Sequence, residues 1–390
     1  VYKRQVQNNI PLSLYVHIPW CVKKCPYCDF NSHKKDQAYD EVRYVEALLA
    51  DLDEEYQHCQ QRPLNSIFFG GGTPSLFSPD SIHKILNHAR RLFKFNEIEI
   101  TLEANPGTFE QQKFDDFRQA GVNRLSIGIQ SFSQQHLKTL GRIHDGRQAL
   151  SAIETAKIAG FDNINLDLMF GLPQQTIQQA VKDVKTACEF KVPHISHYQL
   201  TIEENTYFHK HRPVLPESDM LWEMQLQCQE LLANNGYQQY EISAYAIKDR
   251  QSLHNINYWS FGDYIGIGAG AHGKLSRFDE QQHSLSISRR WKHRQPRQYT
   301  EEALSANALS GQKILDQQDI VFEFLLNALR LKEGCEISAF EKHTGLSRDK
   351  LEEAASEIDP ELLRLEGHRI STTDRGFLFL NEILEKLIVE

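Results

Sequence analysis

Three cysteines stand close together near the start of the chain. Cys21, Cys25 and Cys28 have a C-x3-C-x2-C spacing and directly follow an apolar run over residues 12–18. Three thiolates on so short a loop can converge on one metal centre. A [4Fe–4S] cluster takes four ligands, so three cysteines leave one iron open to a non-protein ligand. The spacing therefore predicts a [4Fe–4S] cluster with an open iron.

Two other interpretations fit the same cysteines. They can bind a structural zinc ion with His33 as the fourth ligand, which would make the chain a zinc-stabilised binding module without redox chemistry. They can also be ordinary buried thiols. The spacing favours the cluster over both.

The elements that must hold this loop alternate along the chain. Short apolar runs and longer helical patterns succeed one another from residue 11 to about 245, which predicts a parallel sheet covered by helices in a partial (β/α)6 barrel. In such α/β folds the reactive groups lie where the strands end, and the cysteine loop follows the first strand at that edge. We expect strands over 12–18, 66–69, 98–103, 124–129, 163–169 and 195–200, and helices near 38–58, 79–93, 109–119, 146–159, 174–190 and 218–235.

Polar residues and glycines gather at the ends of these predicted strands. Each has an ordinary explanation, such as a glycine-rich turn or a solvated strand-end glutamate. Together, carboxylates, an amide and a guanidinium around one barrel mouth suit a zwitterionic ligand that carries a ribose. Arg142 suits a carboxylate and Asp167 a ribose hydroxyl. The candidates are Gly71, Gly72, Thr73, Glu103, Gln130, Arg142 and Asp167.

These motifs together resemble the radical SAM superfamily, and within it the oxygen-independent coproporphyrinogen III oxidase-like family. The resemblance covers residues 11 to about 385 and rests on LYVHIPWC, CPYCDF, FGGGTP, EANP, IGIQSF, GRIH and DLMFGLP. It implies that S-adenosylmethionine (SAM) caps the open iron of a cluster held by Cys21, Cys25 and Cys28. An electron donor such as flavodoxin or ferredoxin is implied if SAM is cleaved. The SAM contacts it implies are Tyr15, Gly71, Gly72, Thr73, Glu103, Gln130, Arg142 and Asp167. Tyr15 has an equally consistent reading as a half-buried strand aromatic.

One position divides this family. The dehydrogenases carry a further cysteine two residues after the third cluster ligand, whereas this chain has Phe30 there, and it lacks their N-terminal extension. Both features resemble the HemW heme chaperone branch, which implies a protein that binds heme and transfers it to an acceptor protein. The alternative is a coproporphyrinogen III dehydrogenase, an enzyme that oxidatively decarboxylates propionates. Enzymatic activity is therefore left open.

An HNxxYW segment from His254 to Trp259 also resembles that branch. Histidine is a usual axial ligand of heme iron, and neighbouring Tyr and Trp side chains can pack on the macrocycle. We expect His254 to bind heme iron, with His272 and His197 as the fallback ligands. A packed histidine among aromatic neighbours is the other reading.

The chain divides into four predicted segments. Residues 1–10 are expected to be a disordered tail or one introduced by cloning, and 11–245 the radical SAM partial barrel. Residues 246–317 form an extension with the HNxxYW segment and a linker, and 318–390 a small winged-helix-like α+β domain. Residues 319–390 carry 16 acidic and 9 basic residues, a net charge of −7, so this domain is not expected to bind nucleic acid. The basic run over 289–297 is expected to be a solvated face.

The composition indicates which partners and which cellular compartment to expect. The chain is 40% hydrophobic and 24% charged with a net charge of −9, which argues against nucleic acid and anionic lipid as partners. We find no apolar run long enough to span a bilayer and no signal peptide. The other cysteines (Cys59, Cys188, Cys228 and Cys335) are scattered, as in a reducing compartment. We expect a cytoplasmic protein without an integral membrane segment.

Overall fold

The computed structural model describes residues 10–36, 39–59, 61–93, 95–107, 111–279 and 284–387. Residues 1–9 of the predicted tail lie outside these ranges. Ile10, the last residue of that tail, is buried, and its carbonyl accepts a hydrogen bond from Arg62. The packed fold therefore includes residue 10.

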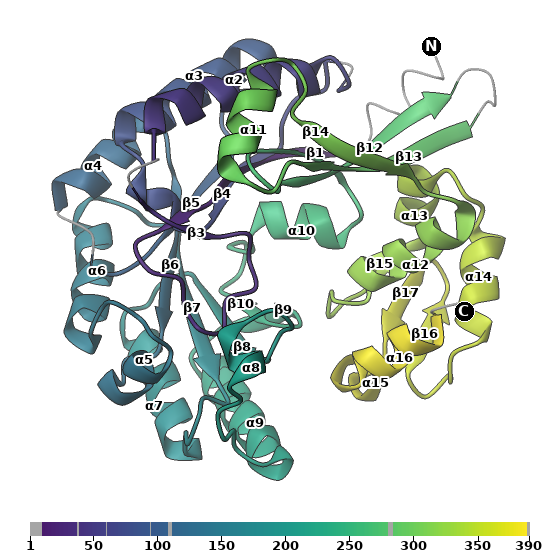
Figure 1. The fold of residues 1–390 in the computed structure, drawn as a ribbon. Coiled ribbons are helices and arrows are strands. Elements are labelled where there is room, and N and C mark those ends of the chain that lie inside the picture. Colours follow the sequence, from purple (N-terminus) through teal and green to yellow (C-terminus); the bar gives the residue numbers. More distant parts are fainter. Residues whose placement is uncertain are drawn as a thin grey trace.

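One sheet runs through most of the chain (Figure 1). Its strand order is β14-β13-β12-β11-β1-β4-β5-β6-β7-β8-β10-β9. The six central strands are parallel and curve without closing on themselves, as predicted for a partial barrel. They are β1 (Leu12–Ile18), β4 (Ser66–Gly71), β5 (Glu99–Ala104), β6 (Arg124–Gln130), β7 (Ile164–Phe170) and β8 (His194–Gln199).

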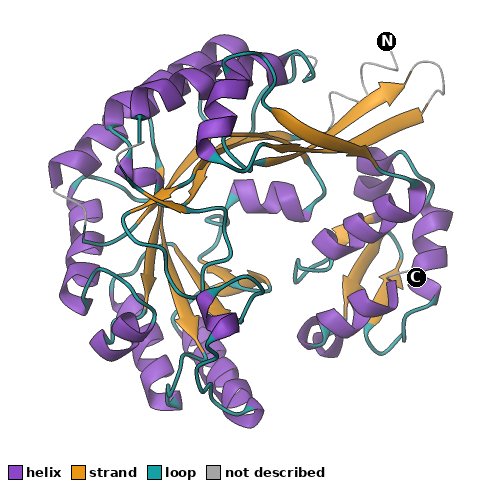
Figure 2. Cartoon of the chain, in the orientation of Figure 1, coloured by secondary structure: helices purple, strands orange, loops and turns teal. Residues whose placement is uncertain are grey.

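Helices cover the outer face of this sheet (Figure 2). Their sequences mark their starts, since Asp145 and Thr176 form capping boxes with Gln148 and Gln179. The main helices confirm the predicted positions; they are α2 (Glu41–Tyr56), α3 (Pro79–Phe93), α4 (Gln111–Ala120), α6 (Gly146–Ile158), α7 (Ile177–Glu189) and α9 (Ser218–Asn234). Shorter elements between them are β2 (Trp20–Cys21), β3 (His33–Lys34), η1 (Pro74–Leu76), α5 (Gln134–Thr139) and α8 (Tyr207–Lys210).

The sheet continues beyond the six parallel strands on both sides. On one side β11 pairs in parallel with β1, so hydrogen bonding runs across the predicted boundary at residue 245. Gly266 of β11 packs directly against backbone, because a Cβ at this position would lie 2.0 Å from the carbonyl oxygen of His272. The elements from residue 238 to residue 314 are β9 (Gln238–Glu241), β10 (Ala244–Ala246), α10 (Leu253–Trp259), β11 (Asp263–Ile267), β12 (His272–Asp279), β13 (Ser284–Lys292), α11 (Pro296–Ala303) and β14 (Leu309–Ile314).

Part of the basic run is buried, so the prediction of a solvated face is wrong for that part. Lys292 is 2% exposed and Arg290 is 8% exposed. The Lys292 ammonium lies 2.6 Å from carboxylate oxygens of both Asp51 and Glu55, and Arg290 lies 3.1 Å from Glu55. These ion pairs join β13 to α2. The sequence pattern does not reveal them, because the acidic partners lie on a helix more than 230 residues earlier in the chain.

The C-terminal residues form a small α+β domain beside the barrel (Figure 1). Phe261 and Ile287 of the extension pack into its hydrophobic core, so the domain is attached through shared apolar burial. Its strands form a small sheet in the order β15-β17-β16. The elements are α12 (Gln317–Ala328), β15 (Cys335–Glu336), α13 (Ile337–Thr344), α14 (Arg348–Ser356), β16 (Leu363–Glu366), β17 (Arg369–Thr372), α15 (Asp374–Leu378) and α16 (Leu380–Leu387).

Over the described part of the chain, every helix is too short or too polar to traverse a lipid bilayer.

Candidate functional site

The cysteine loop is held at its base by a short ladder. Trp20 and Cys21 of β2 pair with His33 and Lys34 of β3, which brings the two ends of the loop together. The indole of Trp20 is buried among aromatic rings and lies 4.5 Å from the ring of Tyr44, centroid to centroid. The loop is therefore anchored to α2, while its three cysteines stay at the strand ends.

Each of the three sulfur atoms has one polar side chain beside it. Thr73 Oγ1 and Arg142 Nη1 donate to the sulfurs of Cys21 and Cys25 at 3.7 Å, and Ser32 Oγ lies 3.7 Å from that of Cys28. Burial raises the pKa of Cys21 to about 11, although the Thr73 hydrogen bond opposes this shift. Burial also raises the pKa of Cys28. Metal binding must therefore displace protons from these thiols, and the nearby donors suit sulfur that carries negative charge.

The cysteines open onto a cavity of about 360 Å³ at the carboxyl ends of the parallel strands. Nearly all the predicted site residues share this cavity, because parallel strands end at one edge of a sheet. They are Cys21, Cys25, Cys28, Gly71, Gly72, Thr73, Glu103, Gln130, Arg142 and Asp167.

Glu103 is a half-buried carboxyl group near the end of β5. One oxygen accepts a hydrogen bond from the backbone N–H of Gly71 at 3.2 Å. Burial raises its pKa to about 8, and the charge of Asp167 adds to the rise. Without a cationic partner the group is mostly protonated at neutral pH. A ligand ammonium would favour its ionised form.

Asp167 lies across the cavity on β7. Its two oxygens accept hydrogen bonds from Ser126 Oγ at 3.0 Å and Asn165 Nδ2 at 2.8 Å. Burial raises its pKa and these two hydrogen bonds lower it. The carboxylate is thus oriented by neighbouring strands before any ligand arrives.

Arg142 bridges the cysteine loop and β6. Besides the Cys25 sulfur, its guanidinium donates to the carbonyl of Gly128 at 2.7 Å and to the side chain of Asn105. Its Nε is buried and has no hydrogen-bond partner among the described residues. A buried N–H without a partner is costly, so this atom suits a ligand oxygen.

Gln130 ends β6 with a positive φ of 67°, and its side-chain oxygen accepts from Tyr198. A non-glycine residue rarely adopts this conformation. The turn at Gln130 places its side-chain amide in the cavity wall beside Tyr198. Tyr198 is not among the predicted site residues.

The FGGGTP glycines lie beneath the cysteine loop. A Cβ on Gly72 would lie 2.6 Å from the carbonyl oxygen of Trp20, and Gly71 has a φ of 119°. The loop can therefore pass over the end of β4 only because these positions lack side chains.

Tyr15 lies on a neighbouring cavity and does not line the one that contains the cysteines. Its hydroxyl donates to His17 Nδ1 at 2.9 Å, and its ring stacks on Phe68. Its predicted contact with SAM stays a prediction.

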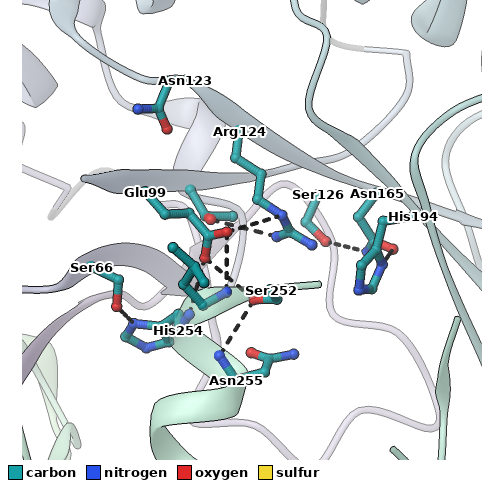
Figure 3. A network of polar contacts seen from close by, with 12 residues as sticks. Ser66, Glu99, Asn123, Arg124, Ser126, Asn165, His194, Ser252, His254 and Asn255 are labelled. Carbon is teal, nitrogen blue, oxygen red and sulfur yellow. Dashed lines mark hydrogen bonds and ion pairs between the residues drawn. The ribbon is translucent and has the colours of Figure 1, made fainter. Parts of the chain in front are cut away.

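His254 is buried inside the barrel on α10 (Figure 3). Its Nδ1 lies 2.8 Å from Ser66 Oγ, and its backbone N–H donates to Glu99. The ring stacks on Phe68 at 5.0 Å between centroids, and burial lowers the pKa of His254 to about 3. Its Nε2 is buried without a partner among the described residues, and His254 is not part of the lining of either cavity. Its role as a heme ligand stays a prediction.

His33, the fourth ligand in the zinc interpretation, lines a different cavity from the cysteines. Across the described residues, no three His, Cys, Asp or Glu side chains converge closely enough to hold a single metal ion.

Sequence reasoning missed several residues of the cysteine cavity. Tyr198 lies near the end of a predicted strand, so the strand-end rule would have found it. Glu241, Trp259 and Arg330 come from β9, α10 and the segment after α12, and no local signal in the sequence joins them. Arg330 lies 3.3 Å from Glu241, and its guanidinium lies over the Trp259 ring at 4.3 Å.

Two family models match this chain. The model of the radical SAM superfamily matches residues 15–187, and the model of the HemN C-terminal domain matches residues 315–379.

Curated relatives are similar along nearly the whole chain. A protein named "Heme chaperone HemW" from Haemophilus influenzae is 47% identical over 386 residues, which cover 97% of this chain and 98% of that protein. One of the same name from Escherichia coli is 46% identical, with 97% and 99% covered, and one from Lactococcus lactis is 33% identical, with 97% and 98% covered.

Among solved structures, coproporphyrinogen III oxidase (HemN) from Escherichia coli, described as a radical SAM enzyme, superposes with a TM-score of 0.80. The sequence identity is 22%, and the match covers 98% of this chain and 92% of that one. This likeness concerns the fold.

Proposed function

This chain belongs to the HemW family of the radical SAM superfamily, and from that membership we propose that it binds heme and delivers it to an acceptor protein. The observation that carries the proposal is the identity of 33–47% to proteins named heme chaperones over 96–97% of this chain. Phe30, which stands where the dehydrogenases of the family carry a further cysteine, agrees with it.

As a radical SAM protein, the chain uses a [4Fe–4S] cluster and SAM as cofactors. We assign the cluster to Cys21, Cys25 and Cys28, whose sulfurs face one cavity with hydrogen-bond donors beside them. The cluster, when bound, supplies an electron and an open iron.

We assign SAM to the same cavity, where the side chains match its charges. Glu103 holds the amino group as an ionised carboxylate, and Arg142 donates to the methionine carboxylate through its unpartnered Nε. Asp167, already oriented by Ser126 and Asn165, accepts from a ribose hydroxyl. Gly71, Gly72, Thr73 and Gln130 shape the wall, and Tyr15 completes the proposed set from the neighbouring cavity.

The proposal includes partners and a compartment. The acceptor is a protein that takes up heme, and a flavodoxin or ferredoxin supplies electrons if SAM is cleaved. Open iron–sulfur clusters and the scattered, unpaired cysteines fit the cytoplasm.

One experiment separates the chaperone from the dehydrogenase. The anaerobically reconstituted full chain is incubated with heme in one arm and with coproporphyrinogen III, SAM and a reductant in the other. We expect a stable Soret band and no protoporphyrinogen. Protoporphyrinogen formation without heme uptake would overturn the proposal. Transfer is then tested by adding apo-protein of a heme enzyme and following recovery of its activity, with free heme at the same concentration as the control.

A further inference from the structure

A second cavity, of about 710 Å³, lies on the concave face of the sheet next to the cysteine cavity. It lies among β1, the cysteine loop, α10 and the strands of the extension. Its volume falls within the range of about 300–1,000 Å³ that is usual for small-molecule and cofactor sites. The SAM proposal uses only Tyr15 of its lining.

Flat rings line this cavity. The rings of Tyr258 and Tyr264 stack at 4.1 Å between centroids. Across the β12–β13 ladder, the rings of His272 and Trp291 lie 6.5 Å apart and within 29° of parallel. Phe30 is 60% exposed at the edge. Such walls suit a large planar ligand that can stack on aromatic faces.

One imidazole in the cavity is available to a metal ion in the ligand. His272 is exposed, and none of the described residues forms a hydrogen bond with its ring. The other lining histidine, His17, is occupied, because its Nδ1 lies 2.9 Å from the Tyr15 hydroxyl and its Nε2 lies 2.9 Å from the Asn31 carbonyl. A neutral imidazole nitrogen with a free lone pair is the usual protein ligand of heme iron.

The charge of the cavity suits an anionic ligand. No Asp or Glu is among the described residues that line it. Lys292 is paired with Asp51 and Glu55, whereas the Arg294 guanidinium has no acidic partner among the described residues. A free guanidinium at the edge can pair with a carboxylate.

The two cavities share one wall. Phe30 lines both, and Asn31 beside it donates from Nδ2 to the carbonyls of Ala269 and Arg294 at 2.8 Å. These bonds tie the cysteine loop to the extension. The loop that carries Cys28 therefore also forms the rim of the second cavity.

We propose that this cavity is the heme site, with His272 as the iron ligand, Tyr258, Tyr264 and Trp291 against the macrocycle, and Arg294 on a propionate. The inference rests on the proposed heme-chaperone function and adds where the heme lies. It assigns the iron to His272 and gives His254 a structural role beneath the cavity, since the ring of His254 lies 5.0 Å from that of Tyr258.

The test is a heme titration of the reconstituted full chain, read by Soret absorbance and by EPR. We expect His272→Ala to weaken heme binding at least about tenfold, equivalent to about 1.4 kcal/mol. His272→Met should bind heme with a shifted Soret band and a changed EPR spectrum, as expected when the iron ligand itself is exchanged. Arg294→Glu should weaken binding severalfold, while Arg294→Lys retains most of it.

Matched controls are His83→Ala and Arg147→Ala, which remove exposed side chains of the same types on α3 and α6. They should bind heme as the wild type does, and all variants should keep their iron and sulfide content. If the wild type takes up no heme, the chaperone function itself fails. If the wild type binds heme and the His272 and Arg294 variants match it in affinity and spectrum, only the site is overturned. Loss of heme in His254→Ala with retention in His272→Ala would also overturn it.

Discussion

At the scale of single residues, the cysteine cavity contains one carboxyl group, Glu103, whose protonation a cationic ligand would reverse. Glu103 and Asp167 are both half-buried, and the loss of solvent around each carboxyl group raises its pKa. Two nearby carboxyl groups without a cation cannot both ionise at low cost. A positively charged ligand group in the cavity would therefore lower the free-energy cost of ionising these carboxyl groups.

Replacing Glu103 with Gln should separate binding from stability. SAM affinity should fall roughly tenfold to a hundredfold, since a charge-assisted hydrogen bond is worth about 1.5–3 kcal/mol. The SAM affinity of Arg142→Ala should fall by a similar factor. Isothermal titration calorimetry measures both, and unchanged affinity in both variants would remove these residues from the SAM site.

The pH dependence of Glu103 has a definite sign. Its pKa is about 8 in the fold against a reference value of 4.5. The free energy of unfolding should therefore fall as pH rises from about 4.5 to 8, and this contribution should vanish in Glu103→Gln. SAM binding at pH 7 should release a proton from Glu103, which calorimetry in two buffers of different ionisation enthalpy detects. No difference between wild type and variant would contradict this pKa.

Loss of any one of the three cysteines should remove the cluster. We expect Cys21→Ala, Cys25→Ala and Cys28→Ala to lose the brown chromophore and most of the roughly four irons per chain. The matched control is Cys59→Ala, a buried cysteine whose thiol donates to the carbonyl of Glu55. Iron and labile-sulfide analysis after anaerobic reconstitution is the measurement, and a full cluster in any single variant would refute the assignment.

At the scale of elements, α10 depends on one carboxylate. Glu99 of β5 accepts from the backbone N–H groups of Leu253 and His254 at 3.2 and 3.0 Å and from the Ser252 hydroxyl (Figure 3). Arg124 lies 3.8 Å away and is also buried. A short helix has little stability of its own, so these contacts set its place inside the barrel.

Glu99→Ala should therefore lower the free energy of unfolding by about 3–5 kcal/mol, because it leaves Arg124 as an unpaired buried charge and two N–H groups without an acceptor. Glu99→Gln should lower the free energy of unfolding by less, since its side-chain oxygen can still accept a hydrogen bond from α10. Glu154→Ala, on the exposed side of α6, is the control and should stay within about 0.5 kcal/mol. Urea unfolding followed by circular dichroism measures all three. Equal stability of Glu99→Ala and the control would show that α10 is held by packing alone.

At the scale of the whole molecule, the C-terminal domain contributes to the wall of the cysteine cavity. The segment after α12 pairs with β9, where the Ile242 N–H donates to the Arg330 carbonyl and the Lys332 N–H to the Tyr240 carbonyl. Arg330 and Glu241 both line the cavity. The acidic C-terminal domain thus acts as part of the enclosure.

Arg330→Ala should destabilise the protein more at pH 8 than at pH 5. Burial raises the pKa of Glu241, and Arg330 opposes that rise. Without Arg330 the Glu241 carboxylate would be costly to ionise, so the loss should reach about 1–3 kcal/mol at high pH and shrink where Glu241 is protonated. Denaturant unfolding at the two pH values measures the difference. A pH-independent loss would mean that Arg330 acts through its packing on Trp259.

The fold class and most of the cysteine cavity could be predicted from the sequence. Apolar strands that alternate with amphipathic helices specify a parallel sheet, and the carboxyl ends of parallel strands meet at one edge. Cys21, Cys25 and Cys28 are close along the chain, and Glu103, Gln130 and Asp167 each end or lie near the end of a strand. Local pattern and strand direction were enough to bring them together.

Residues whose elements are far apart in the chain come together only in the folded molecule, and the sequence does not predict which of them share a cavity wall. The tertiary structure buries Lys292 against Asp51, fixes α10 on Glu99, and brings Arg330 to Glu241. It also separates Tyr15 and His254 from the cysteine cavity, although both belong to motifs that suggest a ligand. Periodicity reports which face of an element is buried. It does not report which distant element covers that face, because this depends on how the extension and the C-terminal domain fold back onto the barrel.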